Sequence, residues 1–264
     1  MANYLFYQLI FMVSRGKAMG GLNWLHLSDW HQGNTEFDRT AVYERLIEDI
    51  ENRTRTISPE LDEIDFIVFT GDVSNSGKQE EYDRVKRDFL DRLLKAAGIN
   101  ANKLYIVPGN HDINIDDFRL LPDELLETLE SEEKVQEWTV DDRARAVVLQ
   151  PFYSFSKFAT DYTEWKHPDY APLDIFDKYE KKIAILGLNS AWMCNRHKTK
   201  DKIDDKNYVL IGEHQIRKSL NDISNANAYL IIVILHHPFE WLNDFDRRHI
   251  ENPLTEKCDF INWA

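Results

Sequence analysis

Short hydrophobic segments bounded by turn residues recur along this chain, and four of them have the length of buried strands. They cover residues 24–28, 65–70, 103–107 and 228–235. Between them, residues 39–56 and 78–97 carry apolar side chains at helical spacing, and Gly98 follows the second segment as a helix-ending residue. This alternation of strand and helix predicts right-handed crossovers and a largely parallel sheet.

The stretch from 113 to 176 interrupts this alternation and predicts a helical cap insert, with helices over 122–138 and 141–160. Aromatic residues gather near its end, at a spacing typical of a hydrophobic core. The alternative that they form a cap wall that touches substrate stays open. These aromatics are Phe152, Tyr153, Phe155, Phe158, Tyr162 and Trp165. After the insert, residues 178–188 alternate as a β-hairpin, and a further helix begins at Gly212.

Residues with metal-binding or acid–base side chains follow each of the four strands. They are Asp29 and His31, Asp72, Asn110 and His111, and His236. Strand ends at the carboxyl edge of an α/β sheet are where binding sites are built. We expect Asp29 and His31 to face the same ion, because side chains two residues apart point the same way in an extended chain. Each motif alone is a weak signal, and the four in order are a strong one.

The combined ligand set indicates which ions could bind. Mixed nitrogen and oxygen ligands suit Mn, Fe, Zn or Co better than Ca or Mg. Two such ions about 3.5–4 Å apart can hold the attacking and leaving oxygens of a phosphoryl displacement. Asp72 suits a place between two ions because each of its two carboxylate oxygens can bind one.

Composition fits one large α/β domain. The chain has 264 residues, of which 43% are hydrophobic and 30% are charged. A net charge of −14 without a dense basic stripe repels a nucleic-acid backbone, so a nucleic-acid partner is disfavoured. Cys194 and Cys258 are too few for a disulfide framework or a CxxC zinc site, which suits a reducing cytoplasm.

Residues 1–18 differ from the rest of the chain. Their apolar run from Tyr4 to Val13 is far shorter than the roughly 20 residues of a membrane helix, and its basic residues follow rather than precede it, unlike those of a signal peptide. Two interpretations stay open: an N-terminal extension, or a misassigned start with Met19 as the true first residue. In either case we expect residues 19–264 to form the domain without this segment.

The order and spacing of these motifs resemble the calcineurin-like metallophosphoesterase family. Its signature runs Asp-x-His, Gly-Asp, Gly-Asn-His-Asp/Glu, a His two residues before a Pro, and finally Gly-His-x-His. The matching residues are Asp29 and His31, Gly71 and Asp72, Gly109 to Asp112, and His236 before Pro238. The resemblance covers about Leu22 to the end apart from the insert, and it implies an α/β fold with a two-sheet β-sandwich flanked by helices in four layers. Within the family, Asn189-Ser190-Ala191-Trp192 and the strand before His236 look closest to the class III cyclic nucleotide phosphodiesterases.

The resemblance also implies a ligand set for two divalent metal ions. Asp29 and His31 would hold the first ion. Asn110 and His236 would hold the second, and Asp72 would bridge the two.

His111 would be a catalytic acid that is not a ligand, and it would protonate the leaving oxygen or steady the phosphate. The implied activity is hydrolysis of a phosphomonoester or phosphodiester by a metal-activated water, with manganese and iron among the candidate metals. The substrate class is then a phosphate ester, and the location the cytoplasm.

One family motif has no counterpart in this chain. The strand expected at Cys258-Asp259-Phe260-Ile261 should lead into Gly-His-x-His, which supplies one ligand to each ion, but the sequence stops at Ala264. We therefore expect a truncation at the C-terminus, and a further domain could follow residue 264. Two alternative functions stay open: a non-catalytic interaction or regulatory domain with an incomplete metal site, and a nuclease.

Overall fold

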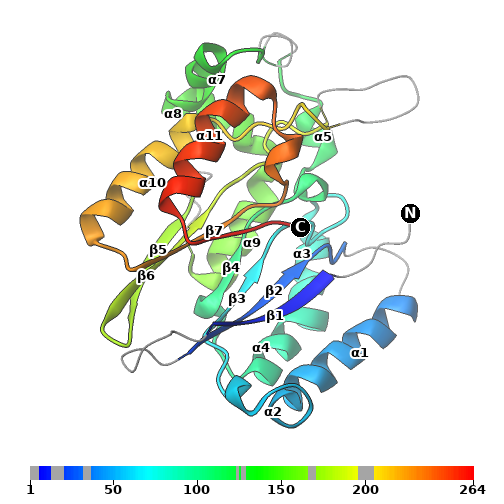
Figure 1. Ribbon diagram of the computed structural model, residues 1–264. Coiled ribbons are helices and arrows are strands. Elements are labelled where there is room, and N and C mark those ends of the chain that lie inside the picture. The colour runs from blue at the N-terminus through cyan, green and yellow to red at the C-terminus, as the bar shows by residue number, and fades with distance from the viewer. Residues whose placement is uncertain are drawn as a thin grey trace.

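Two four-stranded sheets pack face to face at the centre of the computed structural model, and helices cover both outer faces (Figure 1). The structure describes residues 6–12, 21–31, 37–122, 125, 129–165, 171–195 and 205–264. The predicted α/β fold, a two-sheet sandwich flanked by helices, is confirmed.

Each sheet contains one antiparallel edge strand and three strands that run parallel to one another. The first sheet has the order β1-β2-β3-β4, made of Phe6–Met12, Leu22–Ser28, Phe66–Phe69 and Leu104–Ile106. The second has the order β5-β6-β7-β8, made of Leu173–Lys178, Lys181–Gly187, Leu230–Ile234 and Phe260–Asn262. The antiparallel strands are β1 and β5. All four strands expected from the sequence to carry site residues belong to the parallel sets.

The layer between the sheets is apolar and rich in aromatic rings. The Trp24 ring of β2 stacks on Phe66 of β3 with centroids 5.5 Å apart, and it meets Phe260 of β8 edge-on at 5.4 Å. Ile183 and Ile232 of the second sheet lie in the same buried cluster. All seven residues of β2 are buried. Burial on both faces explains why β3 and β7 are continuous hydrophobic runs rather than alternating patterns.

The helices over the first sheet follow the sequence prediction closely. Helix α1 spans Phe37–Glu51 and the short α2 spans Arg53–Thr56, so the helix expected over 39–56 is present with a break. Helix α3 (Gln79–Val85), a π-helical turn (Lys86–Leu90) and α4 (Asp91–Ala97) form the helix expected over 78–97. It ends at Gly98, whose φ of +76° is the left-handed conformation that glycine adopts at little cost.

Helix α9 (Tyr153–Thr163) packs on α3 and belongs to the core of the first sheet. The Phe158 ring stacks on Tyr82 of α3 at 5.0 Å, and Phe155 meets the same tyrosine ring edge-on at 6.2 Å. Tyr153 is the exposed member of the aromatic group, with 67% of its surface accessible. The aromatic residues near the end of the insert therefore serve mainly as core, as their spacing predicts.

The second sheet is covered by α10 (Glu213–Ala226) and α11 (Asp244–Lys257), which lie together in Figure 1. The short helices α5 (Ile115–Phe118), α7 (Glu132–Thr139) and α8 (Asp142–Leu149) contribute to the same hydrophobic cluster. None of the helices in the described ranges has the length and apolar character of a membrane-spanning segment. Single 3₁₀ turns connect several elements, at Pro59–Leu61, Ala101–Lys103, Asn110–Asp112, Gln150–Phe152 and Phe239–Trp241.

Two boundaries in the second half of the chain differ from the prediction. The helix expected over 141–160 breaks at Gln150–Phe152, because Pro151 lacks the N–H that a continuous helix needs. The hairpin turns at Tyr179 and Glu180, and its first strand, β5, begins at Leu173 inside the expected insert. Part of the helix expected over 122–138 lies outside the described residues.

Strand β1 lies within residues 1–18 and pairs with β2 along its whole length, from Phe6 opposite Ser28 to Met12 opposite Leu22. The first sheet therefore contains an edge strand, β1, that was not expected from the sequence. This pairing covers the edge of β2, whose backbone leads directly to Asp29. We accordingly reverse the expectation that the domain is independent of residues 1–18.

Deleting residues 1–18 should lower the melting temperature, because it removes seven paired residues and exposes the edge of a buried strand. Each 1 kcal/mol lost should shift the melting temperature by about 2–4 °C in a domain of this size. Thermal unfolding followed by circular dichroism measures the effect. A deletion of residues 1–5, which spares β1, is the control, and equal melting temperatures for the two deletions would contradict the prediction.

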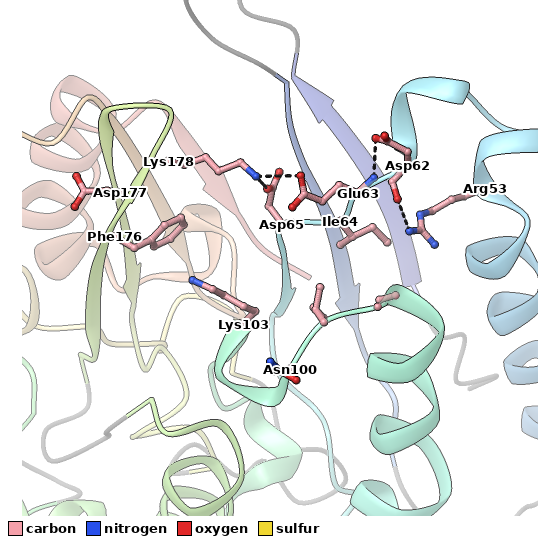
Figure 2. Close-up of a pocket in the computed structure, with 13 residues that line it drawn as sticks. Arg53, Asp62, Glu63, Ile64, Asp65, Asn100, Lys103, Phe176, Asp177 and Lys178 are labelled. Atoms are coloured by element: carbon pink, nitrogen blue, oxygen red, sulfur yellow. Dashed lines mark hydrogen bonds and ion pairs between the residues drawn. The ribbon is translucent and has the colours of Figure 1, made fainter.

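A polar cavity of about 490 Å³ opens at the edge of the sandwich where the parallel strands begin (Figure 2). Across it, Lys178 of β5 pairs with Asp65, which precedes β3, and with Glu63 at 3.2 Å. Arg53 donates to main-chain carbonyls, including that of Leu61 at 2.6 Å. The ion pairs of Lys178 connect the two sheets, and the cavity lies at the opposite strand ends from the predicted site residues.

Candidate metal centre

The residues predicted to bind metal converge at the carboxyl ends of strands from both sheets. Asp29 and His31 follow β2, Asp72 follows β3, Asn110 follows β4, and His236 follows β7. Two groups of metal-ligating atoms, each within 4.8 Å, share Asp72: one is Asp29, Asp72 and His236, and the other is His31, Asp72 and His111. The structure therefore brings together the five expected ligands, and it places His111 beside them.

Asp29 and His31 are joined by a turn rather than by extended chain. Their φ angles are +61° and +50°, in the left-handed region that non-glycine residues rarely adopt. The turn is held by the next loop, because Asp29 N donates to Gly71 O at 3.1 Å and His31 N donates to Asp72 O at 2.8 Å. His31 Nε2 lies 3.5 Å from Asp29 Oδ1, so the two side chains are close, as expected. The reason given for this closeness, the alternation of side chains along an extended strand, is wrong.

Asp72 occupies the centre of the cluster. Its Oδ2 lies 3.5 Å from His31 Nε2 and 3.6 Å from His236 Nε2, while its Oδ1 accepts from the main-chain N–H of His111 at 2.9 Å. Its φ is +56°, and it is 3% exposed. One oxygen is thus oriented by the backbone, and the other faces both imidazoles.

His236 is oriented by the other sheet. Its Nδ1 lies 2.7 Å from the carbonyl oxygen of Thr70, so the neutral ring carries its proton on Nδ1. Its Nε2 then presents a lone pair to Asn110 Oδ1 at 3.3 Å and to Asp72 Oδ2 at 3.6 Å. Three acceptors facing one another repel unless a cation lies between them, so this donor set fits a divalent metal ion.

Charge in the site is balanced between Asp29 and His31. Burial opposes ionisation of Asp29, but the hydrogen bond with His31 and the nearby His236 outweigh it, so the pKa of Asp29 lies below its ordinary value. Burial also opposes protonation of His31, yet Asp29 and Asp72 raise its pKa above the ordinary value. The two shifts have one cause, the attraction between the His31 imidazole and the neighbouring carboxylates, and a metal ion bound to His31 would compete with its proton.

His111 lies at the more accessible side of the cluster. Its Nδ1 lies 3.1 Å from the carbonyl oxygen of Asn75, and its ring meets that of His31 edge-on at 4.6 Å. This arrangement leaves Nε2 as the nitrogen that could exchange a proton with a substrate.

Asp112 has a supporting role that the sequence analysis did not assign. It is fully buried and accepts from Ser74 N at 2.9 Å, from Tyr82 Oη at 3.0 Å and from Gly109 N at 2.9 Å. Burial, together with the charge of Asp72, raises its pKa. Asp112 thereby connects the loop after β3 to the loop after β4. Its position in the Gly-Asn-His-Asp motif is the sequence signal from which this role could have been predicted. The main-chain carbonyls of Thr70 and Asn75, which orient His236 and His111, could not be predicted in this way, because every residue has a carbonyl.

Gly109 allows the loops bearing Asp72 and Asn110 to approach each other. A Cβ added to Gly109 would lie 2.1 Å from Asp72 Oδ1 and 2.5 Å from Asp72 N. Gly109→Ala should therefore displace Asp72 and weaken Mn²⁺ binding by more than about 10-fold, as calorimetric titration can measure.

Gly98→Ala is the control for this substitution, since a Cβ there would meet nothing within 4 Å and only the φ of +76° is unfavourable. Its cost should be about 1–2 kcal/mol of stability without loss of metal affinity. Unchanged Mn²⁺ affinity in Gly109→Ala would show that the close approach to Asp72 does not matter for binding.

The sequence profile of the calcineurin-like phosphoesterases matches residues 22–260 of this chain. An uncharacterized metallophosphoesterase-like protein of Bacillus subtilis (strain 168) is 25% identical over 235 residues, which make up 87% of this chain and 45% of that protein. The chain thus spans less than half the length of this curated relative. Among solved structures, the Haemophilus influenzae NAD nucleotidase aligns over 99% of this chain and 36% of its own, at 14% identity and a TM-score of 0.36. Because the profile covers most of the sequence and its motifs meet at one site, the chain belongs to the calcineurin-like phosphoesterase family.

Proposed function

We propose that this chain acts as a metal-dependent phosphoesterase that hydrolyses a phosphomonoester or a phosphodiester. The observation that carries the proposal is the convergence of carboxylate, amide and imidazole acceptors at the ends of strands from both sheets, with His236 Nε2 only 3.3 Å from Asn110 Oδ1. Such a set creates a negative electrostatic potential, which a pair of divalent cations would neutralise. Membership of the family supports the same reaction class.

The proposed ligand assignment gives each of two cations its own residues and one shared residue. Asp29 and His31 would hold the first cation, and Asn110 and His236 would hold the second. Asp72 would serve both, which its short distances to the two imidazoles support. The mixture of nitrogen and oxygen donors favours Mn, Fe, Zn or Co.

Bound divalent cations would act as Lewis acids toward the phosphate and would lower the pKa of a coordinated water. The side chains of the protein provide orientation and proton transfer. His111, held at Nδ1 by the carbonyl of Asn75, would donate a proton from Nε2 to the leaving oxygen. The main-chain N–H of His111 holds Asp72, so the motif couples the position of the acid to that of the shared ligand.

Removal and replacement of metal tests this proposal. The chelated protein should hydrolyse neither nitrophenyl phosphate nor bis-nitrophenyl phosphate, and added Mn²⁺ should restore hydrolysis of at least one of them. Two ions per chain, measured by elemental analysis, should accompany full activity. Hydrolysis that persists after chelation would contradict the proposal, whereas absent metal would favour a non-catalytic interaction domain. Cleavage confined to DNA or RNA would favour the nuclease alternative.

A cytoplasmic location stays part of the proposal. Cys194 and Cys258, both among the described residues, are not joined in a disulfide, which suits a reducing compartment. The partner we propose is a phosphate-ester substrate, and the negative charge of the chain argues against a nucleic-acid partner.

A further inference from the structure

The peptide group that joins His236 to His237 is held on both sides. Its carbonyl, that of His236, accepts from Ala264 N at 3.1 Å, just beyond β8. Its N–H, that of His237, donates to the side-chain oxygen of Ser190 at 3.0 Å. The loop after β7 is therefore fixed by the ends of its two neighbouring strands, β6 and β8.

Ser190 makes a second contact with the same residue. Its Oγ lies 3.0 Å from His237 Nδ1. Either group can donate in this contact, because a hydroxyl oxygen that accepts one N–H keeps a second lone pair as well as its own proton. The other ring nitrogen of His237, Nε2, lies 3.8 Å from Cys194 Sγ. Ser190 is 0% exposed and His237 is 3% exposed, so water cannot replace either contact.

The loop that carries Ser190 is itself fixed to helix α10. Asn189 N donates to Gln215 Oε1 at 2.9 Å, and Gln215 Nε2 donates back to Asn189 O at 2.8 Å. Asn189 Oδ1 accepts from Ala191 N at 2.9 Å, which closes a turn around Ser190. A fully bonded buried network therefore runs from the start of α10 to the residue beside His236, and such networks are rigid when every member is satisfied.

We propose that Ser190 is a positioning residue for His236, and that its hydroxyl fixes the loop so that His236 Nε2 faces Asn110 and Asp72. This inference rests on the proposed metal site. A merely structural role would lower stability without a preference for one ion. If Ser190 has a positioning role, its loss should weaken the binding of the ion held by Asn110 and His236. It should leave the binding of the ion held by Asp29 and His31 unchanged.

Ser190→Ala tests the proposal by removing both hydrogen bonds and leaving the backbone intact. Substitutions of groups that orient a metal ligand typically cost about 10–100-fold in metal affinity. Stepwise Mn²⁺ titration by calorimetry should therefore show one of the two dissociation constants raised by about this factor. The constant that rises should be the one that also rises in Asn110→Ala, which loses a ligand of the same ion, and not the one that rises in Asp29→Asn.

Two further variants keep the test decisive. Ser190→Cys fills nearly the same space with a weaker hydrogen-bonding group, so it should raise the same dissociation constant by a smaller factor. It provides the test if Ser190→Ala does not fold. Thr139→Val is the control, because Thr139 is also fully buried and its hydroxyl bonds Val135 O at 2.8 Å, far along the chain on α7. It should leave both constants unchanged.

A metal-free measurement separates this inference from the proposed function. In nitrogen-15 spectra of the chelated protein, His236 should show its proton on Nδ1 and a hydrogen-bonded Hδ1 resonance, and Ser190→Ala or Ser190→Cys should shift or broaden it. Unchanged metal constants and an unchanged His236 resonance in these variants would overturn the positioning role. If the unsubstituted protein binds no metal, the proposed function fails and the His236 resonance alone decides the role of Ser190.

Discussion

Replacing Asp72 with asparagine should remove more bound metal than any other single substitution in the site. The carboxylate lies 3.5 Å from His31 Nε2 and 3.6 Å from His236 Nε2, so its charge acts on both proposed ion positions. Substitution of a group that only orients a ligand already lowers metal affinity about 10–100-fold. Loss of the shared ligand should therefore lower it by more than about 100-fold. Elemental analysis of the purified variant, followed by Mn²⁺ titration, measures this effect.

The substitution is suited to the question because asparagine has the shape of aspartate. Its side-chain oxygen can still accept from the main-chain N–H of His111, which holds Asp72 at 2.9 Å, so the loop should keep its conformation. Asp177→Asn removes the same charge from an exposed position on β5 and is the matched control. Full metal content in Asp72→Asn would exclude Asp72 from the shared position.

His111→Ala should leave metal binding nearly intact and slow hydrolysis by about 10²–10⁴-fold, the usual contribution of a general acid. The alanine variant keeps the main-chain N–H that orients Asp72, because only the imidazole is removed. The loss should be smaller for nitrophenyl esters than for alkyl esters, since nitrophenolate leaves without a proton. Steady-state rates on a series of esters measure this dependence.

Two results would contradict the acid role of His111. An equal loss for good and poor leaving groups would mean that the imidazole does not protonate the leaving oxygen. A fall in metal content would mean that His111 is a ligand, which its place in one of the two ligand groups allows. His249→Ala, at an exposed position on α11, is the histidine control and should change neither rate nor metal content.

The strands that carry the site were predictable because each is buried on both faces and ends in an unusual polar group. Phe66–Phe69 and Leu230–Ile234 are uninterrupted apolar segments, which only a covered parallel sheet accommodates. Parallel strands of one sheet bring their carboxyl ends to one edge, so the order of motifs along the chain was enough to bring Asp29, Asp72 and Asn110 together. His236 joins them from the second sheet, at the end of β7. The helix ending at Gly98 was predictable for a local reason, the left-handed conformation that follows its last turn.

Other features depend on contacts distant in sequence, which the pattern of one segment cannot reveal. Strand β1 pairs with β2 across a connection of nine residues, from Met12 to Leu22, and its apolar run alone suits several kinds of segment. The left-handed turn at Asp29 and His31 depends on the acceptors Gly71 O and Asp72 O in a different loop. The proton position on His236 is set by a main-chain carbonyl of the opposite sheet. Sequence therefore identified the candidate ligands, whereas their orientation required the fold.

The two sheets are tied together at both ends of their strands. At one end His236 Nδ1 meets Thr70 O at 2.7 Å, and at the other Lys178 pairs with Asp65. Two layers joined at both ends and packed tightly between resist rocking or sliding against each other, so hinge closure of the sandwich around a substrate is disfavoured. Opening and closing during turnover would fall to the loops beyond the strand ends. A change of substrate preference among relatives could then arise in those loops alone, while the strands that carry the ligands keep their places.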